Sequence, residues 1–146
     1  MENTEVTAKT LEEALEIALK ELDAERDEVV TRMQKFLYAK PWRDANPDGV
    51  AHEKALILAH DRHGIELALE NVFTRDDISG DISAISAPTL VIVGELDRAT
   101  PPEKAQRIVD AIPGARLVTV ADSGHHSPIE NPEAVNRALS DFLATL

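Results

Sequence analysis

Residues 87–97 read APTLVIVGELD, an apolar run that passes through a glycine to an aspartate. The segment Thr89 to Val93 is short and rich in β-branched residues, which is typical of a strand buried in a parallel sheet. The loop Gly94-Glu95-Leu96-Asp97 follows it directly. We therefore predict that Asp97 lies at the carboxyl end of a buried strand.

A second segment repeats this organisation. Arg116 to Val120 has the composition of a strand, and the loop Ser123-Gly124-His125-His126 follows it. A helix is predicted after each loop. The first helix is predicted to begin with Thr100 as its cap, Pro101 at the first helical position and Glu103 as the partner in a capping box. The second helix is predicted to begin at Asn131-Pro132-Glu133.

The order strand, helix, strand, helix predicts two parallel strands joined by a right-handed crossover. The carboxyl ends of such strands meet at one edge of the sheet, where open α/β sheets build their sites. Asp97 and His125 are expected to meet there. The predicted fold class is therefore α/β, with a parallel β-α-β-α unit over residues 81–146.

These residues resemble the C-terminal portion of the α/β-hydrolase family. The similarity runs through three stretches: Ala87 to Asp97, Pro113 to Leu117 and Gly124 to Val135. It covers residues 81–146 without a gap. Each stretch alone is weak, whereas their combination in this order is specific.

The resemblance implies that Asp97 orients His125 and that His125 is the general base of a Ser-Asp-His triad. The family places this imidazole directly after the glycine, which selects His125 over His126. His126 is then expected at a pocket rim or on the surface. Glu130 matches an acidic position before the last helix, where a structural role is expected. The alternative for Asp97 is a turn carboxylate that stabilises the following helix.

The nucleophile of such a triad is missing from this sequence. In the family it precedes the Asp and His, in the pattern G-x-S-x-G. None of the six serines stands between glycines; they are Ser79, Ser83, Ser86, Ser123, Ser127 and Ser140. Ser123 shares a loop with His125 and has no separate elbow to present it. The isolated chain is therefore predicted to be inactive.

Residues 1–80 have a different, helical character. Apolar residues recur at helical spacing from Thr10 to about Ala39, where Thr10 and Glu13 form a capping-box pattern. Pro41 and Pro47 are predicted to interrupt the chain. Shorter helices are expected around Val50 to Ala59 and Ile65 to Phe73.

This half resembles, less specifically, the helical lid that the family inserts before the strand that carries the Asp. Phe36, Tyr38, Trp42 and Phe73 would then help cover an apolar pocket, or would only pack the helices together. His60 and His63 have no third ligand at a convincing spacing, so no metal site is predicted. The predicted fold is a truncated α/β hydrolase: a lid-like region 1–80 and an α/β segment 81–146.

The composition limits the kinds of molecule that the chain is expected to bind. The formal net charge of -12 disfavours nucleic acid and anionic membrane surfaces. No cysteine is present, so disulfides and thiolate chemistry are excluded. No apolar run approaches the roughly 18 residues of a membrane span, and the first residues do not resemble a signal peptide. We expect a cytoplasmic protein that needs no cofactor.

The sequence therefore predicts part of a hydrolase whose parent cleaves carboxylic esters or lactones and takes a small acyl substrate. One alternative is a non-catalytic module that binds a partner chain through the open sheet edge and the lid. Another is part of a dehalogenase or epoxide hydrolase, in which an Asp is the nucleophile. The open edge of the first strand also predicts self-association or an N-terminal partner chain.

Overall fold

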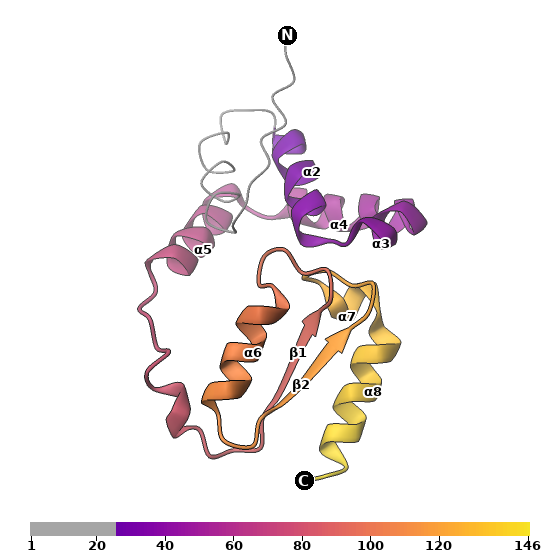
Figure 1. Ribbon diagram of the computed structural model, residues 1–146. Helices are drawn as coiled ribbons and strands as arrows, with labels where there is room; N and C mark the ends of the chain where they lie inside the picture. The colour runs from indigo at the N-terminus through magenta and orange to yellow at the C-terminus, as the bar shows by residue number, and fades with distance from the viewer. Residues whose placement is uncertain (1–25) are drawn as a thin grey trace.

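The computed structural model describes residues 26–146, apart from the side chain of Phe73. The capping box predicted at Thr10 and Glu13 lies outside the described residues. The elements run in the order α2, α3, α4, α5, η1, β1, α6, β2, α7 and α8. Figure 1 shows two parts, a group of helices and a small sheet flanked by helices.

The sheet consists of two parallel strands, β1 (Leu90–Gly94) and β2 (Arg116–Val120). In the register, Leu90 lies opposite Arg116 and Gly94 lies opposite Val120. The strand predicted at Thr89 to Val93 is thus shifted by one residue, and the one predicted at Arg116 to Val120 is confirmed. Within residues 26–146 no further strand pairs with β1.

Two amphipathic helices pack on this sheet, α6 (Pro102–Ala111) and α8 (Pro132–Leu143). Figure 1 shows α6 beside β1 and α8 beside β2. Asn131 caps α8, since its side chain accepts a hydrogen bond from the Ala134 amide at 3.2 Å. The core of this part is formed by six buried apolar side chains: Val93, Ala99, Ala105, Ile112, Val120 and Val135.

The cap predicted for α6 is wrong. The helix begins at Pro102, its N-cap is Pro101, and no side chain caps it. The Thr100 hydroxyl bonds to Asp97 instead. The charged carboxylate is a strong acceptor for the hydroxyl proton, and this bond holds the Thr100 side chain toward Asp97 rather than toward the amides of α6.

The helical part contains α2 (Arg26–Leu37), α3 (Lys40–Ala45), α4 (Pro47–Ala59) and α5 (Arg62–Thr74). The buried side chain of Gln34 on α2 donates to the Val50 carbonyl on α4 at 2.7 Å. Pro41 and Pro47 interrupt the helical run as predicted, since α2 ends at Leu37 and α3 ends at Ala45. They lie in the first turns of α3 and α4, where a missing N–H leaves no hydrogen bond unmade.

The connection between the two parts runs through the short helix η1 (Ile82–Ala84), which the sequence did not predict. The carboxyl ends of β1 and β2 point toward α2, α3 and α4 (Figure 1). The two loops that follow the strands therefore lie between the sheet and the helices. No helix of the described residues is long and apolar enough to cross a membrane.

Candidate functional site

The loops after β1 and β2 are joined along their backbones. The Glu95 amide donates to the Val120 carbonyl at 2.8 Å, and the Leu96 amide donates to the Ser123 carbonyl at 2.8 Å. These bonds continue the parallel pairing of the strands beyond their ends. They bring the aspartate of the first loop to the histidine of the second.

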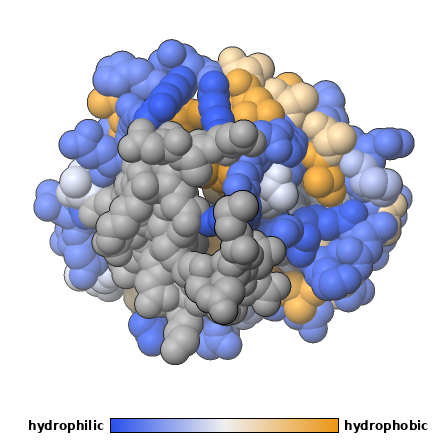
Figure 2. Space-filling model, turned by 90° about the horizontal axis from the view of Figure 1, so that it is seen from above, coloured by the Kyte–Doolittle hydropathy of each residue, from blue (hydrophilic) through white to orange (hydrophobic). Residues whose placement is uncertain are grey.

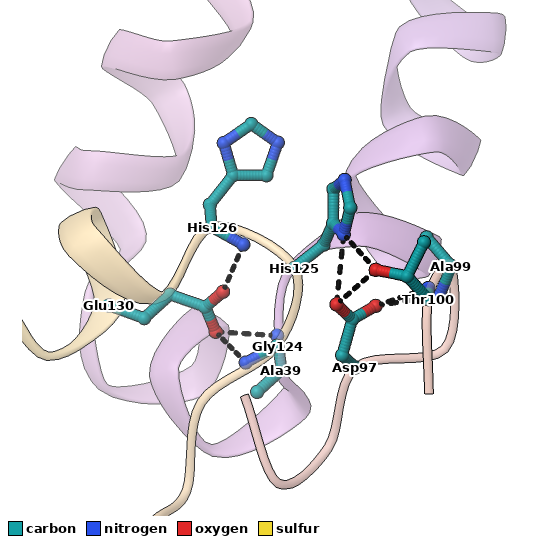
Figure 3. Close-up of polar contacts among 8 residues, drawn as sticks. All are labelled: Ala39, Asp97, Ala99, Thr100, Gly124, His125, His126 and Glu130. Atoms are coloured by element: carbon teal, nitrogen blue, oxygen red, sulfur yellow. Dashed lines mark hydrogen bonds and ion pairs between the residues drawn. The ribbon is translucent and has the colours of Figure 1, made fainter. Parts of the chain in front are cut away.

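Asp97 and His125 form a hydrogen-bonded pair, although 28 residues separate them in the chain. The distance between Oδ2 of Asp97 and Nδ1 of His125 is 2.9 Å. The Asp97 side chain is 4% exposed and that of His125 is 37% exposed. The carboxylate is thus buried and the imidazole is partly exposed. Figure 3 shows the imidazole directly against the carboxylate.

The remaining lone pairs of Asp97 are also used. Its Oδ1 accepts the amides of Ala99 and Thr100, both at 2.8 Å. Its Oδ2 accepts the Thr100 hydroxyl at 2.9 Å. Asp97 therefore holds both the histidine and the turn before α6 by hydrogen bonds, so its contacts are compatible with either of the two predicted roles.

The hydroxyl of Thr100 also lies 3.2 Å from Nδ1 of His125. Its proton goes to Asp97, so only its oxygen lone pairs face the imidazole. Two acceptors thus converge on Nδ1, which must carry the ring proton. Nε2 then keeps its lone pair and is the basic nitrogen.

The contact between Asp97 and His125 changes the pKa of both residues. Burial alone would raise the pKa of Asp97, but hydrogen bonds from His125 and Thr100 outweigh it and lower that pKa. The hydrogen bond to Asp97 raises the pKa of His125 against the opposing effect of burial. The site therefore favours a carboxylate beside a proton-accepting imidazole, which is the arrangement of a general base with its orienting acid.

His126 lies on the other side of the loop, half-buried against the helical part. Its ring stacks on Tyr38 with 4.5 Å between centroids, and Tyr38 stacks on Trp42 at 5.1 Å. Burial lowers the pKa of His126. Figure 3 shows its ring apart from Asp97, which agrees with the choice of His125 as the partner of Asp97.

Glu130, the last residue of α7 (Ser127–Glu130), faces the same loop. Its carboxylate accepts backbone amides of Ala39, Gly124 and His126 (Figure 3). The sequence indicated a structural role but not these partners. Ala39 is 91 residues away from Glu130, and no local pattern reports such a contact.

The other candidates have different surroundings. Ser123 is 0% exposed, and its hydroxyl has no hydrogen-bond partner among the described residues, so it is not presented to a substrate. Phe36 lies under the guanidinium of Arg98, 5.2 Å from ring centroid to Cζ. The side chain of Phe73 lies outside the described part. No cluster of three or more His, Cys, Asp or Glu suited to a metal ion occurs among the described residues.

Comparison with known proteins shows to which family this chain belongs. A family model described as TAP-like protein matches residues 71–146. A second, described as Jag N-terminus, matches residues 6–32, of which only 26–32 are described. The chain is 33% identical over 124 residues to the "Putative carbamate hydrolase RutD" of Pseudomonas savastanoi pv. phaseolicola, covering 84% of this chain and 48% of that protein.

Solved structures agree on the fold. A thermophilic esterase from Thermogutta terrifontis has a TM-score of 0.80 and 27% identity, covering 92% of this chain and 50% of that one. An enol-lactonase from Burkholderia xenovorans LB400 has a TM-score of 0.81 and 24% identity, covering 92% and 51%. The chain spans about half the length of the relatives that it matches.

Proposed function

Because the chain belongs to the α/β-hydrolase family, as a C-terminal portion of that fold, we propose that it supplies the acid and the base of a serine hydrolase triad. The observation that carries this proposal is the pair of Asp97 and His125, joined at 2.9 Å at the carboxyl ends of adjacent strands. Its homologues are hydrolases, and the ester or lactone substrate is inferred from the esterase and the enol-lactonase.

In the proposed reaction, Nε2 of His125 takes the proton of a serine hydroxyl as the serine oxygen attacks the acyl carbon. His125 then gives this proton to the leaving alcohol oxygen, and the ester bond breaks. A water molecule then gives a proton to His125 as its oxygen attacks the acyl carbon of the acyl-enzyme. His125 returns this proton to the serine oxygen as that bond breaks and the acid leaves. Asp97 holds Nδ1–H in place and stabilises the imidazolium throughout.

The serine and the oxyanion hole are proposed to come from outside this sequence, because no G-x-S-x-G occurs among its residues. An acid and a base without these parts lose the main terms of the rate enhancement. The isolated chain should therefore not hydrolyse a chromogenic ester such as p-nitrophenyl acetate faster than free imidazole does.

The test supplies the missing half. The chain is co-expressed with the part of the Thermogutta terrifontis esterase that it does not match, which is half of that protein. Ester hydrolysis should appear and should be lost with the elbow serine replaced by alanine, or with His125→Gln in this chain. A burst of product from the isolated chain that depends on His125 would contradict the proposal.

A second candidate is a non-catalytic module that binds a partner chain through the edge of β1. The observation that favours it is that this strand has one neighbour within the described residues. Its residues Leu90, Val91 and Ile92 are only partly buried. Such an edge exposes backbone donors and acceptors that pair readily with another strand.

A further inference from the structure

Glu130 holds three backbone amides from two distant segments. Its Oε2 accepts the amide of Ala39 at 2.8 Å and that of Gly124 at 2.9 Å. Its Oε1 accepts the amide of His126 at 3.1 Å. One carboxylate therefore binds the loop on both sides of His125 and fastens it to the residue that precedes α3.

The loop and the end of α2 also meet directly. The His125 amide donates to the Leu37 carbonyl at 2.8 Å. At Gly124, an added Cβ would lie 2.7 Å from both the Ala39 nitrogen and the Leu37 oxygen. The two backbones are thus in contact without an intervening side chain, and the position of one determines that of the other.

Within residues 26–146, the side chain of His125 is 37% exposed and makes its polar contacts through Nδ1, with Asp97 and Thr100. Its ring also meets the ring of His126 edge-on, with 5.7 Å between centroids. The amides of Ala39 and Gly124 belong to buried residues, so loss of their carboxylate would leave buried donors unpaired. The loop would then move to reach water, and the imidazole would move with it.

We infer that Glu130 is a positioning residue for His125, which it holds against Asp97 by fastening the loop to residues 37–39. The inference rests on the proposed role of His125 as the general base. It needs no activity to be tested, so its failure can be told apart from a failure of the proposed function.

The experiment uses the 146-residue chain with nitrogen-15 label and compares Glu130→Gln, Glu130→Ala and the control Glu133→Gln. Glu133 is an exposed residue in the first turn of α8. All three variants remove one negative charge. The glutamine can keep its carbonyl oxygen on Ala39 and Gly124 but loses the bond to His126, whereas the alanine loses all three.

Two signals are read: amide hydrogen exchange at His125, and the downfield resonance of its Nδ1 proton. We expect exchange at His125 to be about tenfold faster in Glu130→Gln than in Glu133→Gln, and faster again in Glu130→Ala. Exchange at Glu95, whose amide bonds to Val120, should stay unchanged. The Nδ1 proton should persist in Glu133→Gln and weaken from the glutamine to the alanine variant.

Three results would overturn the inference. Unchanged exchange and an unchanged Nδ1 resonance in Glu130→Ala would show that His125 is held without Glu130. Equal acceleration at Glu95 and His125 would show that Glu130 supports the whole fold rather than this loop. Equal effects of the glutamine and alanine variants would assign the effect to charge and also reject the proposed restraint.

Discussion

Gly94 and Ser123 approach each other so closely that a Cβ on Gly94 would lie 2.3 Å from the Ser123 carbonyl oxygen. The same Cβ would lie 2.1 Å from the carbonyl oxygen of Gly124. Both atoms belong to the backbone of the loop that carries His125 and cannot rotate away. Because Gly94 has no side chain, the loop after β1 can form backbone hydrogen bonds with the loop that carries His125.

Gly94→Ala should destabilise the chain by about 3 kcal/mol or more, because the backbone collision forces the strands or the loops apart. The matched control is Gly80→Ala, where an added Cβ meets no atom within 4 Å. That change should alter stability by less than about 1 kcal/mol. Urea unfolding measures both. Equal stability of the two variants would contradict the close approach of the loops.

Thr100→Val should lower the activity of the assembled enzyme about tenfold, since valine keeps the shape but loses the hydroxyl between Asp97 and His125. Thr100→Ser should retain most of the activity. Asp97→Asn should cost far more, on the order of 10⁴ as in the serine protease template. Measurement of kcat/KM for the three variants tests this ranking. Full activity of Thr100→Val would show that the Thr100 hydroxyl does not contribute to catalysis.

The stability of the chain should depend on pH through the same pair. The pKa of Asp97 is lowered by folding, so its contribution is present above about pH 4 and is lost as the pH falls through the lower folded value. The pKa of His125 is raised, so its contribution is present below about pH 6.5 and is lost as the pH rises through the higher folded value.

The difference in unfolding free energy between wild type and Asp97→Asn should therefore be largest between about pH 4 and pH 6.5. It should shrink on both sides of this range. Urea unfolding at a series of pH values measures it, with Glu133→Gln as the control for removing a charge. A difference that stays constant from pH 3 to pH 9 would show that the two groups do not titrate as a pair.

The edge of β1 predicts self-association of the isolated chain that grows with salt, because salt screens the repulsion from a net charge of -12. Val91→Lys on β1 should weaken this association more than Thr119→Lys on β2, although both variants change the net charge equally. Analytical sedimentation at several salt concentrations measures the associated fraction of wild type and of both variants. A monomer throughout, or equal effects of the two lysines, would show that the edge of β1 is not the contact.

Much of the sheet and its site could be predicted from local sequence. The β-branched run before Gly94 indicates a buried strand wherever it occurs, and the order of elements then brings Asp97 to His125. The prolines were harder to interpret. Pro41 and Pro47 can end a helix or begin one, and only the position of the preceding turn separates these outcomes.

The long-range polar contacts could not be predicted. The pattern Thr-Pro-Pro-Glu favours a helix cap at Thr100, whereas the hydroxyl in fact serves Asp97 and His125. Glu130 reaches an amide 91 residues away, which depends on how the helices meet the sheet. The conformational preferences of a short segment do not predict a hydrogen bond to a residue that is distant in the sequence. The division near residue 80 also stays a prediction.

The bond from the His125 amide to the Leu37 carbonyl has a consequence for protein engineering. If residues 26–40 were exchanged for the corresponding segment of a relative, the new segment would have to support the loop of His125. A recombination point placed after Lys40 would separate Leu37 from the His125 amide and Ala39 from Glu130. The donor segment therefore has to keep the backbone position of residues 37–39 in order to leave the histidine in place.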